Sequence, residues 1–408
     1  MDFLDTGNTA FMLLATSLVM LMTPGLAFFY GGLVGRKNVL TIMMQSFVSL
    51  GITTIIWFSV GYSLCFSGDN FGIIGNLDKA FMMGILPTDV SPYGDGTIPE
   101  LLFAAYQMMF AIITPALITG AFTNRVRFKA YLLFLVAWLF LVYFPFVHMI
   151  WHPEGLLAQW GVLDFAGGIV VHNIAGMAAL ASVLYVKKRR VMEDGPHSIP
   201  LVALGTGLLW FGWYGFNAGS ALTVNTVTTT AFINTDIAAS CAAISWLLVE
   251  WMLLKKPKFV GLLTGAVAGL ATITPAAGFV TPQAAAVIGL VSGIVCFGAV
   301  SLKNRLKLDD ALDVWGVHGV GGLIGIVMLG LFATTAVNAD GVNGLFYGNA
   351  SFFGKQLAAI VISSVYAFGF TFLMLFLINK ITRVVTTEKE EAELDNSTHG
   401  ESAYRGAF

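Results

Sequence analysis

Two histidines, His172 and His318, lie inside long apolar stretches of the chain, where ionisable side chains are rare. Each is followed four residues later by a glycine, Gly176 and Gly322, which leaves space beside the imidazole. A neutral imidazole offers one hydrogen-bond donor and one acceptor, and ionisable groups inside membrane segments are candidates for substrate pathways. The pair could therefore let a small polar solute pass through an apolar interior.

Enzymatic and metal chemistry find less support in the sequence. A metalloenzyme needs three or four converging ligands, and no third ligand is expected at the depth of the two histidines. His148 and His152 have the i,i+4 spacing of a metal pair, but Pro153 and the loop after it favour an incidental pair. The three cysteines lie in apolar runs without CxxC spacing, as small buried hydrophobic residues do. We expect a protein that is not an enzyme and has no cofactor and no metal site.

The composition indicates an integral membrane protein. Of 408 residues, 57% are hydrophobic and 11% are charged, whereas soluble proteins are about 25% charged. The net charge of −2 argues against a nucleic-acid partner. The N-terminal stretch carries Asp2 and Asp5 and no basic residue, so it lacks the positive region of a signal peptide. The first apolar run is therefore expected to remain as a membrane span.

The apolar segments predict an all-α integral membrane fold with eleven transmembrane helices. A transmembrane helix needs about 20 mostly apolar residues, and polar residues, glycines and prolines separate the segments. The expected spans are 9–34, 39–66, 99–122, 130–150, 163–186, 198–219, 231–254, 259–277, 283–302, 312–334 and 352–382.

Basic residues predict the orientation of these spans. Alternate connections and the C-terminal tail hold nineteen of the 21 lysines and arginines, leaving Lys79 and Lys355 on the other side. Because basic residues favour the cytoplasmic side of a membrane, we expect the N-terminus outside and the C-terminus in the cytoplasm.

A weak internal repeat surrounds the two histidines. GIVVHNIAG at 168–176 resembles GVHGVGG at 316–322, and an aspartate precedes each, Asp164 and Asp313. The segments fall on spans five and ten, which cross the bilayer in opposite directions, as in an inverted-topology repeat. Each histidine would lie roughly 12–14 Å from a helix end, near the middle of a hydrocarbon core about 30 Å thick. The two side chains are therefore expected within hydrogen-bond reach.

These patterns predict one membrane domain at 1–383 and a cytoplasmic tail at 384–408. The domain would contain inverted repeats at about 1–190 and 197–335, with the eleventh span at 352–382 outside the symmetry. The charged tail would be flexible on its own and would pack against the cytoplasmic loops.

Aspartates beside the repeated segments are expected to be structural. Asp164 lies next to glycines at the start of span five, where it could accept hydrogen bonds from the first amides of the helix. Asp309, Asp310 and Asp313 begin span ten and are expected to act in the same way.

Longer motifs resemble those of the ammonium transporter, methylammonium permease and Rhesus family, in its prokaryotic form. The stretch from Asp164 to Arg189 resembles the signature of the family, and the resemblance covers nearly the whole chain. Further matching motifs, in family order, are TPGLAFFYGGLVGRKNVL, FGWYGFNAGSAL, TPAAGFV, DDALDVWGVHGVGG and HGESAY. The resemblance implies a homotrimer in the cell membrane, with one narrow hydrophobic path in each subunit.

The resemblance also implies roles for individual residues. Trp151 and Ser220, with Tyr106 beside them, match the outer substrate-binding vestibule. The other matches are the gate residues Phe110 and Phe216, the pore residues Trp213, His172 and His318, and Asp164 near the outer site. The stretch WHPEGLL departs from the family, which has a glycine-rich turn after this tryptophan.

The implied function is ammonium transport, with methylammonium as a related substrate. An aromatic vestibule would attract the cation by roughly 0.5–2 kcal/mol. Carrying an intact ion into a low-dielectric interior costs on the order of 20 kcal/mol before relaxation, whereas removing its proton at neutral pH costs about 3–4 kcal/mol. A dry pore should therefore conduct ammonia, with or without a proton that moves separately. The alternatives are an ammonium sensor that signals through its tail and a pore for another small neutral solute.

The tail at 393–408 resembles the regulatory C-terminus of the family. Relatives are blocked from the cytoplasm by a trimeric PII-type signalling protein, so the resemblance implies such a partner. A solubilising tail is the alternative.

Overall fold

The computed structural model describes residues 4–191 and 195–404. Asp2 and the last four residues of the predicted tail, 405–408, lie outside the described residues. Within the described ranges the chain forms helices and connecting turns, with isolated β-bridges and no longer strand. The predicted all-α fold class is confirmed.

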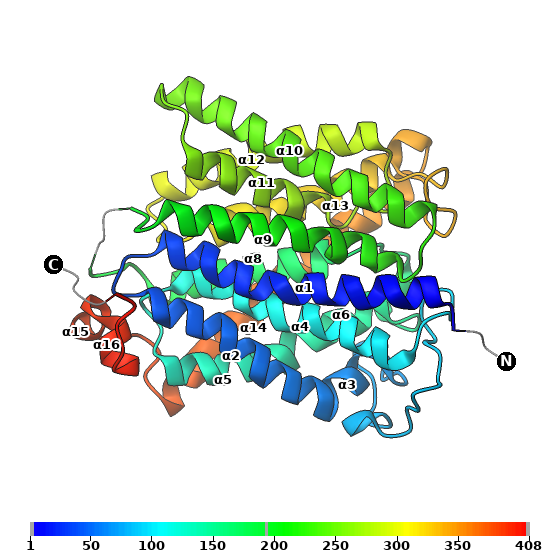
Figure 1. The fold of residues 1–408 in the computed structure, drawn as a ribbon, viewed down its shortest axis with the longest axis horizontal. Coiled ribbons are helices and arrows are strands. Elements are labelled where there is room, and N and C mark those ends of the chain that lie inside the picture. The colour runs from blue at the N-terminus through cyan, green and yellow to red at the C-terminus, as the bar shows by residue number, and fades with distance from the viewer. Residues whose placement is uncertain (1–3, 192–194, 405–408) are drawn as a thin grey trace.

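Long helices run side by side and form one bundle (Figure 1). The N-terminus lies at one end of this bundle, called the N-terminal end below, and α15 and α16 lie at the opposite end, called the tail end. The helices up to residue 186 are α1 (Thr6–Leu33), α2 (Val39–Ile56), η1 (Trp57–Gly61), α3 (Tyr62–Phe66), η2 (Ala80–Met82), α4 (Glu100–Phe122), α5 (Phe128–Trp138), η3 (Leu139–Tyr143), α6 (Phe144–Trp151), α7 (Leu156–Trp160), η4 (Gly168–Asn173) and α8 (Ile174–Val186). Those that follow are α9 (Ile199–Ala218), η5 (Gly219–Ala221), α10 (Thr226–Leu254), α11 (Phe259–Ile273), α12 (Pro282–Arg305), η6 (Trp315–Gly319), α13 (Val320–Phe332), η7 (Leu345–Tyr347), α14 (Ala350–Ile381), α15 (Glu388–Ala392) and α16 (Leu394–His399).

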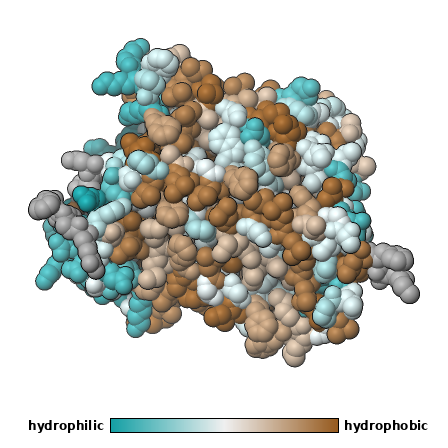
Figure 2. Space-filling view, viewed as in Figure 1, coloured by the Kyte–Doolittle hydropathy of each residue, from teal (hydrophilic) through white to brown (hydrophobic). Residues whose placement is uncertain are grey.

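The bundle has the surface of a membrane protein. Among the described residues, ten helices are long and apolar enough to cross a membrane, and α11 is a shorter apolar helix. Hydrophobic side chains cover the middle of the visible face, while hydrophilic ones gather at its two ends (Figure 2). Apolar surface around the middle suits lipid tails, and polar surface at the ends suits water and headgroups.

Several expected spans differ from the helices in their boundaries, and in three of them the helix is shorter at one end for a clear reason. The helix expected at 259–277 ends at Ile273, because Pro275 cannot continue it and tight turns follow. The helices expected from 163 and 312 begin later, at Gly168 and Trp315. In both of these the first residues form a non-helical turn that carries an aspartate.

Helices from the two sequence repeats pack in corresponding pairs. The first long helix of each repeat, α1 and α9, lie against each other and run side by side (Figure 1). The last of each, η4–α8 and η6–α13, also contact each other. This is the packing that an inverted repeat with its axis through the middle of the bundle predicts.

Two glycines allow the second pair of helices to touch. A Cβ atom on Gly176 would lie 2.1 Å from the Cα atom of Gly319, next to His318. In the other repeat, a Cβ atom on Gly322 would lie 2.7 Å from the carbonyl oxygen of Gly168 and 2.9 Å from Cβ of His172. Because each glycine has no side chain, the backbone that carries the opposite histidine can pack directly against it.

Substituting Gly176 by alanine should destabilise the bundle. The added methyl group meets backbone and not a movable side chain, so overpacking should cost about 1–3 kcal/mol. Gly298→Ala is the matched control, because a Cβ atom on Gly298, in α12, would meet nothing within 4 Å. Alanine there should be neutral or stabilise by up to about 1 kcal/mol. Equal unfolding midpoints for the two variants in detergent would contradict this account.

Candidate functional site

His172 and His318 face each other in the centre of the bundle. Their Nδ1 atoms lie 3.3 Å apart and their ring centroids 5.3 Å apart, as the sequence predicted. Both side chains are buried, with 1% and 4% of their surface exposed. His172 comes from η4 and His318 from η6, so the contact between them joins the two sequence repeats.

The Nδ1 contact fixes the protonation pattern of the pair. A hydrogen bond between two Nδ1 atoms requires that one of them carries the proton and the other accepts it. If both rings are neutral, one histidine has a bare Nε2 acceptor and the other has an Nε2–H donor. Nε2 of His172 is buried and has no hydrogen-bond partner in the described part of the chain. The pair therefore presents both a donor and an acceptor to a neutral guest.

Both histidines lie in π-helical turns, Gly168–Asn173 and Trp315–Gly319. Such turns are rare and are frequently found at functional sites. Each turn is the first part of a longer helix, so its opening amide groups have no partner in a preceding turn of helix.

Asp164 provides those partners for the first helix. Its carboxylate is buried and accepts four backbone hydrogen bonds of 2.6–3.1 Å, from Gly167, Gly168, Ile169 and Val170. The predicted capping role is confirmed. Because all four bonds are to the carboxylate oxygens, Asp164 is committed to the helix end.

Asp310 provides them for the second helix. It accepts hydrogen bonds from the backbone of Val314 at 3.1 Å and Trp315 at 2.7 Å. Burial raises the pKa of Asp310 to about 6, while the charge of Lys303 and the two backbone hydrogen bonds act to lower it. Asp164 precedes His172 by eight residues and Asp310 precedes His318 by eight, so Asp310 is the counterpart of Asp164. The alignment of Asp164 with Asp313 was wrong by three residues.

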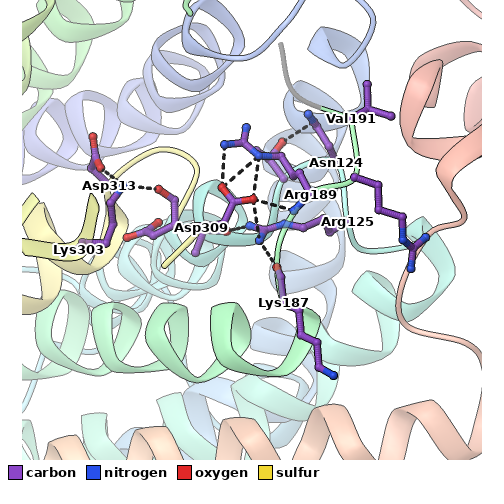
Figure 3. Close-up of polar contacts among 12 residues, drawn as sticks. Asn124, Arg125, Lys187, Arg189, Val191, Lys303, Asp309 and Asp313 are labelled. Atoms are coloured by element: carbon purple, nitrogen blue, oxygen red, sulfur yellow. Dashed lines mark hydrogen bonds and ion pairs between the residues drawn. The ribbon is translucent and has the colours of Figure 1, made fainter. Parts of the chain in front are cut away.

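The other two aspartates of this turn form ion pairs and do not cap the helix, contrary to prediction. Asp309 lies between Arg189 and Arg125 (Figure 3), 2.7 Å from Nη2 of Arg189 and 3.5 Å from Nη1 of Arg125. Burial raises the pKa of Asp309, but the hydrogen bond from Arg189 and the charge of Arg125 hold it below its usual value. Asp313 pairs with Lys303 at 2.5 Å. Asp309 and Asp313 therefore form ion pairs because Arg189 and Lys303, which belong to other parts of the chain, lie beside them.

Aromatic rings connect the histidines with the N-terminal end of the bundle. The rings of Phe110 and Phe216 are in contact, with centroids 4.3 Å apart, and both are 1% exposed. Trp151 lies edge-on to Phe110 at 5.8 Å, and His172 stacks with Phe216 at 6.1 Å and with Trp213 at 5.5 Å. The five side chains form a continuous aromatic column.

Among the cavities that the described residues line, three follow this column from one end of the bundle to the other. The first, about 180 Å³, is lined by Trp151, Phe110 and Ser220 at the N-terminal end and is called the vestibule below. The second is about 10 Å³, space for about one water-sized molecule, and is lined by Phe216 and both histidines, with Trp213 beside them. The third, about 300 Å³, extends from His318 to the tail end and is called the exit cavity. The two phenylalanines separate the first cavity from the second.

Two predicted vestibule residues line the first cavity and the third does not. Trp151 donates its indole N–H to the carbonyl of Asp164 at 2.9 Å, which fixes the ring. The hydroxyl of Ser220 donates to the carbonyl of Phe216 at 2.9 Å, leaving lone pairs free to accept. Tyr106 is fully buried behind Ser220, with its hydroxyl 3.3 Å from the serine. Tyr106 therefore supports Ser220 from behind and does not line the cavity.

Sequence reasoning missed other vestibule residues, among them Gln107 and Tyr93. Gln107 lies three residues before Phe110, on the same face of α4, and this spacing could have identified it. Tyr93 comes from the long connection after α3 and stacks on Phe103 at 4.6 Å. No periodic pattern marks a residue in such a loop.

The turn that departs from the family packs behind Trp151. The rings of His148 and His152 stack with centroids 4.4 Å apart, and both side chains are buried. His148 contacts the carbonyl of Cys65 and the carboxylate of Asp69, each at 2.9 Å, and this hydrogen bond lowers the pKa of Asp69. Among the residues described, no three His, Cys, Asp or Glu side chains are placed to hold a metal.

The tail packs on the loops of the tail end. Asp395 accepts hydrogen bonds from the backbone of Leu40 and Thr41 and from the Thr41 hydroxyl, at 2.8–2.9 Å, and so caps α2. Glu391 accepts from the backbone of Arg190 and Val191 at 2.8 and 3.1 Å. These contacts confirm the predicted packing against the loops.

Further contacts attach the tail to three of these loops. Glu390 pairs with Arg127 at 2.8 Å. At the end of the described chain, the hydroxyl of Tyr404 lies 2.9 Å from Nε2 of His197, with Arg36 over its ring at 5.1 Å. Tail residues thus contact three separate connections, those after α1, α4 and α8.

Comparison with known proteins gives consistent matches over the chain. The family model described as "Ammonium Transporter Family" matches residues 10–404. An ammonium transporter of Bacillus subtilis (strain 168) is 48% identical over 99% of this chain and 100% of its own length. Ammonium transporter Amt1 of Archaeoglobus fulgidus is 44% identical over 98% of this chain and 100% of its own.

Solved structures share the fold. The crystal structure of Candida albicans Mep2 has a TM-score of 0.90 at 35% identity, covering 99% of this chain and 95% of that one. A structure titled "Sensor Amt Protein" has a TM-score of 0.87 at 30% identity, covering 96% of this chain and 98% of that one.

Proposed function

This chain belongs to the ammonium transporter family, and we propose that its aromatic column and paired histidines are the route by which ammonia crosses the membrane. The observation that carries the proposal is the 3.3 Å contact between His172 and His318 in a buried apolar setting. It gives a dry path one neutral donor and one neutral acceptor.

The N-terminal end faces the outside in this proposal, and the tail end faces the cytoplasm. The distribution of lysines and arginines along the sequence supports this orientation. The membrane is the cell membrane, and substrate enters through the vestibule.

Ammonium is recruited in the vestibule by Trp151 and Ser220. An indole face attracts a cation by about 0.5–2 kcal/mol, and the free lone pairs of the serine hydroxyl accept its N–H groups. Tyr106 holds the serine in place from behind, and Asp164 holds the tryptophan through its carbonyl group.

The gate of Phe110 and Phe216 favours ammonia over any ion. No polar atom replaces the hydration shell of a cation between these rings, so an intact ion meets the desolvation cost of several kcal/mol or more. Ammonium avoids that cost by passing a proton to water in the vestibule, which costs about 3–4 kcal/mol near neutral pH. Potassium has no proton to leave.

Beyond the gate, Trp213 lines the narrow space and the histidines exchange hydrogen bonds with ammonia. The bare Nε2 accepts from one ammonia molecule and the Nε2–H donates to it, and neither ring becomes charged. The exit cavity then leads to the cytoplasm.

A homotrimer with a PII-type partner completes the proposal, with the membrane domain at 1–383 and the tail at 384–408. Lipid-exposed apolar side chains on α1, α9 and α10 offer surface for subunit contacts. The docked tail presents a shaped cytoplasmic surface for a trimeric signalling protein. A sensor that signals through the same tail is the second candidate, favoured by the likeness to the structure titled "Sensor Amt Protein".

Replacing His172 by glutamate should make the pore conduct cations. A fixed negative charge at the narrowest point lowers the cost of an intact ion, so potassium current should appear beside ammonium current. Purified protein in planar membranes under ammonium and potassium gradients measures both, with the unsubstituted chain as reference. Rejection of potassium by the variant would contradict the proposed filter.

Trp151→Leu should weaken recruitment and leave the fold intact. Loss of a cation–aromatic contact of about 1 kcal/mol should raise the half-saturating ammonium concentration roughly fivefold, with little change at saturation. Trp160→Leu is the control, since Trp160 is exposed on α7. Uptake of methylammonium into proteoliposomes over a concentration series measures the effect, and matching curves for the two variants would count against the vestibule.

Deleting residues 384–408 should lower transport while trimers still assemble. The deletion exposes the first amides of α2 and unpaired basic groups in the loops at the tail end. Asp395→Asn should have a weaker effect of the same kind, and Glu388→Gln, at an exposed tail position, should have none. Uptake assays measure transport, and size-exclusion chromatography measures trimer assembly. Full activity of the truncated chain would show that the tail is a passive extension.

A further inference from the structure

A large cavity outside the proposed route lies at the tail end of the bundle. Its volume is about 810 Å³, and its walls come from the end of α10, the start of α11 and the end of α12. Apolar side chains such as Leu253, Phe259 and Phe297 line much of it. Since α10 ends on the tail-end side of the bundle (Figure 1), where hydrophilic side chains gather (Figure 2), the cavity lies at the level of lipid headgroups.

Glu250 is a buried acid in the wall of this cavity. Only 8% of its surface is exposed, and its Oε2 atom has no hydrogen-bond partner within the described residues. Its Oε2 atom is covered by the start of α11, where a Cβ atom on Gly261 would lie 1.7 Å away. A buried carboxylate without a partner is unfavourable, so this side chain favours a ligand that brings a hydrogen-bonding cation.

Two basic side chains line the same cavity. Lys258 directly precedes α11 and Arg305 is the last residue of α12. Both side chains are exposed, and neither forms an ion pair or a side-chain hydrogen bond among the residues that the structure describes. Lys258 influences Glu250 electrostatically but forms no ion pair with it. Both cations remain available to an anionic group.

We propose that this cavity binds a phospholipid with a primary-amine headgroup, of the phosphatidylethanolamine type. The ammonium group of the lipid donates a hydrogen bond to Oε1 of Glu250, the carboxylate oxygen that α11 leaves uncovered. The phosphate lies between Lys258 and Arg305, and an acyl chain covers the apolar wall near Leu253 and Phe297. Charge complementarity selects this headgroup, because the cavity combines one unpaired acid with two unpaired bases beside an apolar wall.

Other occupants fit the same groups less well. A choline headgroup carries no N–H to donate to Glu250, and a glycerol headgroup carries no cation. Free phosphate would pair with Lys258 and Arg305 and leave both the acid and the apolar wall uncovered.

The site lies beside the exit cavity, with which it shares Val260, Thr264 and Asp313. A bound lipid would therefore support the start of α11 next to the pore without entering it.

Native mass spectrometry of the full-length protein tests the proposal. The protein is incorporated into nanodiscs made of equal parts phosphatidylglycerol and either phosphatidylethanolamine or phosphatidylcholine, and the retained lipid is measured. A charge-assisted hydrogen bond predicts roughly tenfold stronger retention of phosphatidylethanolamine. Glu250→Gln should abolish that preference, and Glu388→Gln, on the exposed tail, should keep it.

Lys258→Ala tests the contact with the phosphate separately from the contact with the ammonium group. It should weaken retention of both zwitterionic lipids and leave their ratio unchanged, since both carry the phosphate. Equal retention of the two lipids by the unsubstituted chain would overturn the proposal, as would an unchanged preference in Glu250→Gln. If Glu250→Gln instead promotes subunit dissociation with the lipid preference intact, the cavity is a contact between copies and the lipid site is wrong.

Discussion

Two buried carboxylates hold the centre of this protein together. A helix that begins inside a protein must find partners for its first amides, because lipid and apolar side chains offer none. Asp164 and Asp310 meet that need and let η4–α8 and η6–α13 start well inside the bundle. Since each histidine lies eight residues beyond its aspartate, the position of the pair depends on these helix starts.

The same arrangement keeps the path dry. The aspartate charges are taken up by backbone amides and by arginine and lysine partners, so they do not draw water between the aromatic rings. Rings that touch at 4.3 Å and a space of about 10 Å³ leave little room for hydration. Selectivity then rests on chemistry that a solute can perform by itself, namely giving up a proton.

Periodic and compositional signals allowed much of this to be predicted from sequence. Long apolar segments gave the helices, and the spacing of the two histidines within a repeat gave their pairing. Roles set by distant partners were not predictable: Asp309 and Asp313 looked like helix caps until Arg189 and Lys303 were placed beside them. Tyr93 and the buried position of Tyr106 also depend on loops and packing that no local pattern records.

The cap on α2 has a consequence for how the chain is made. Asp395 follows every long helix in the sequence, yet it bonds to Leu40 and Thr41 near the beginning. During synthesis, α2 is therefore built long before its cap emerges from the ribosome. The contacts of Asp395 cannot form before then, so a tail docked on α2 marks a chain that has been translated almost to its end.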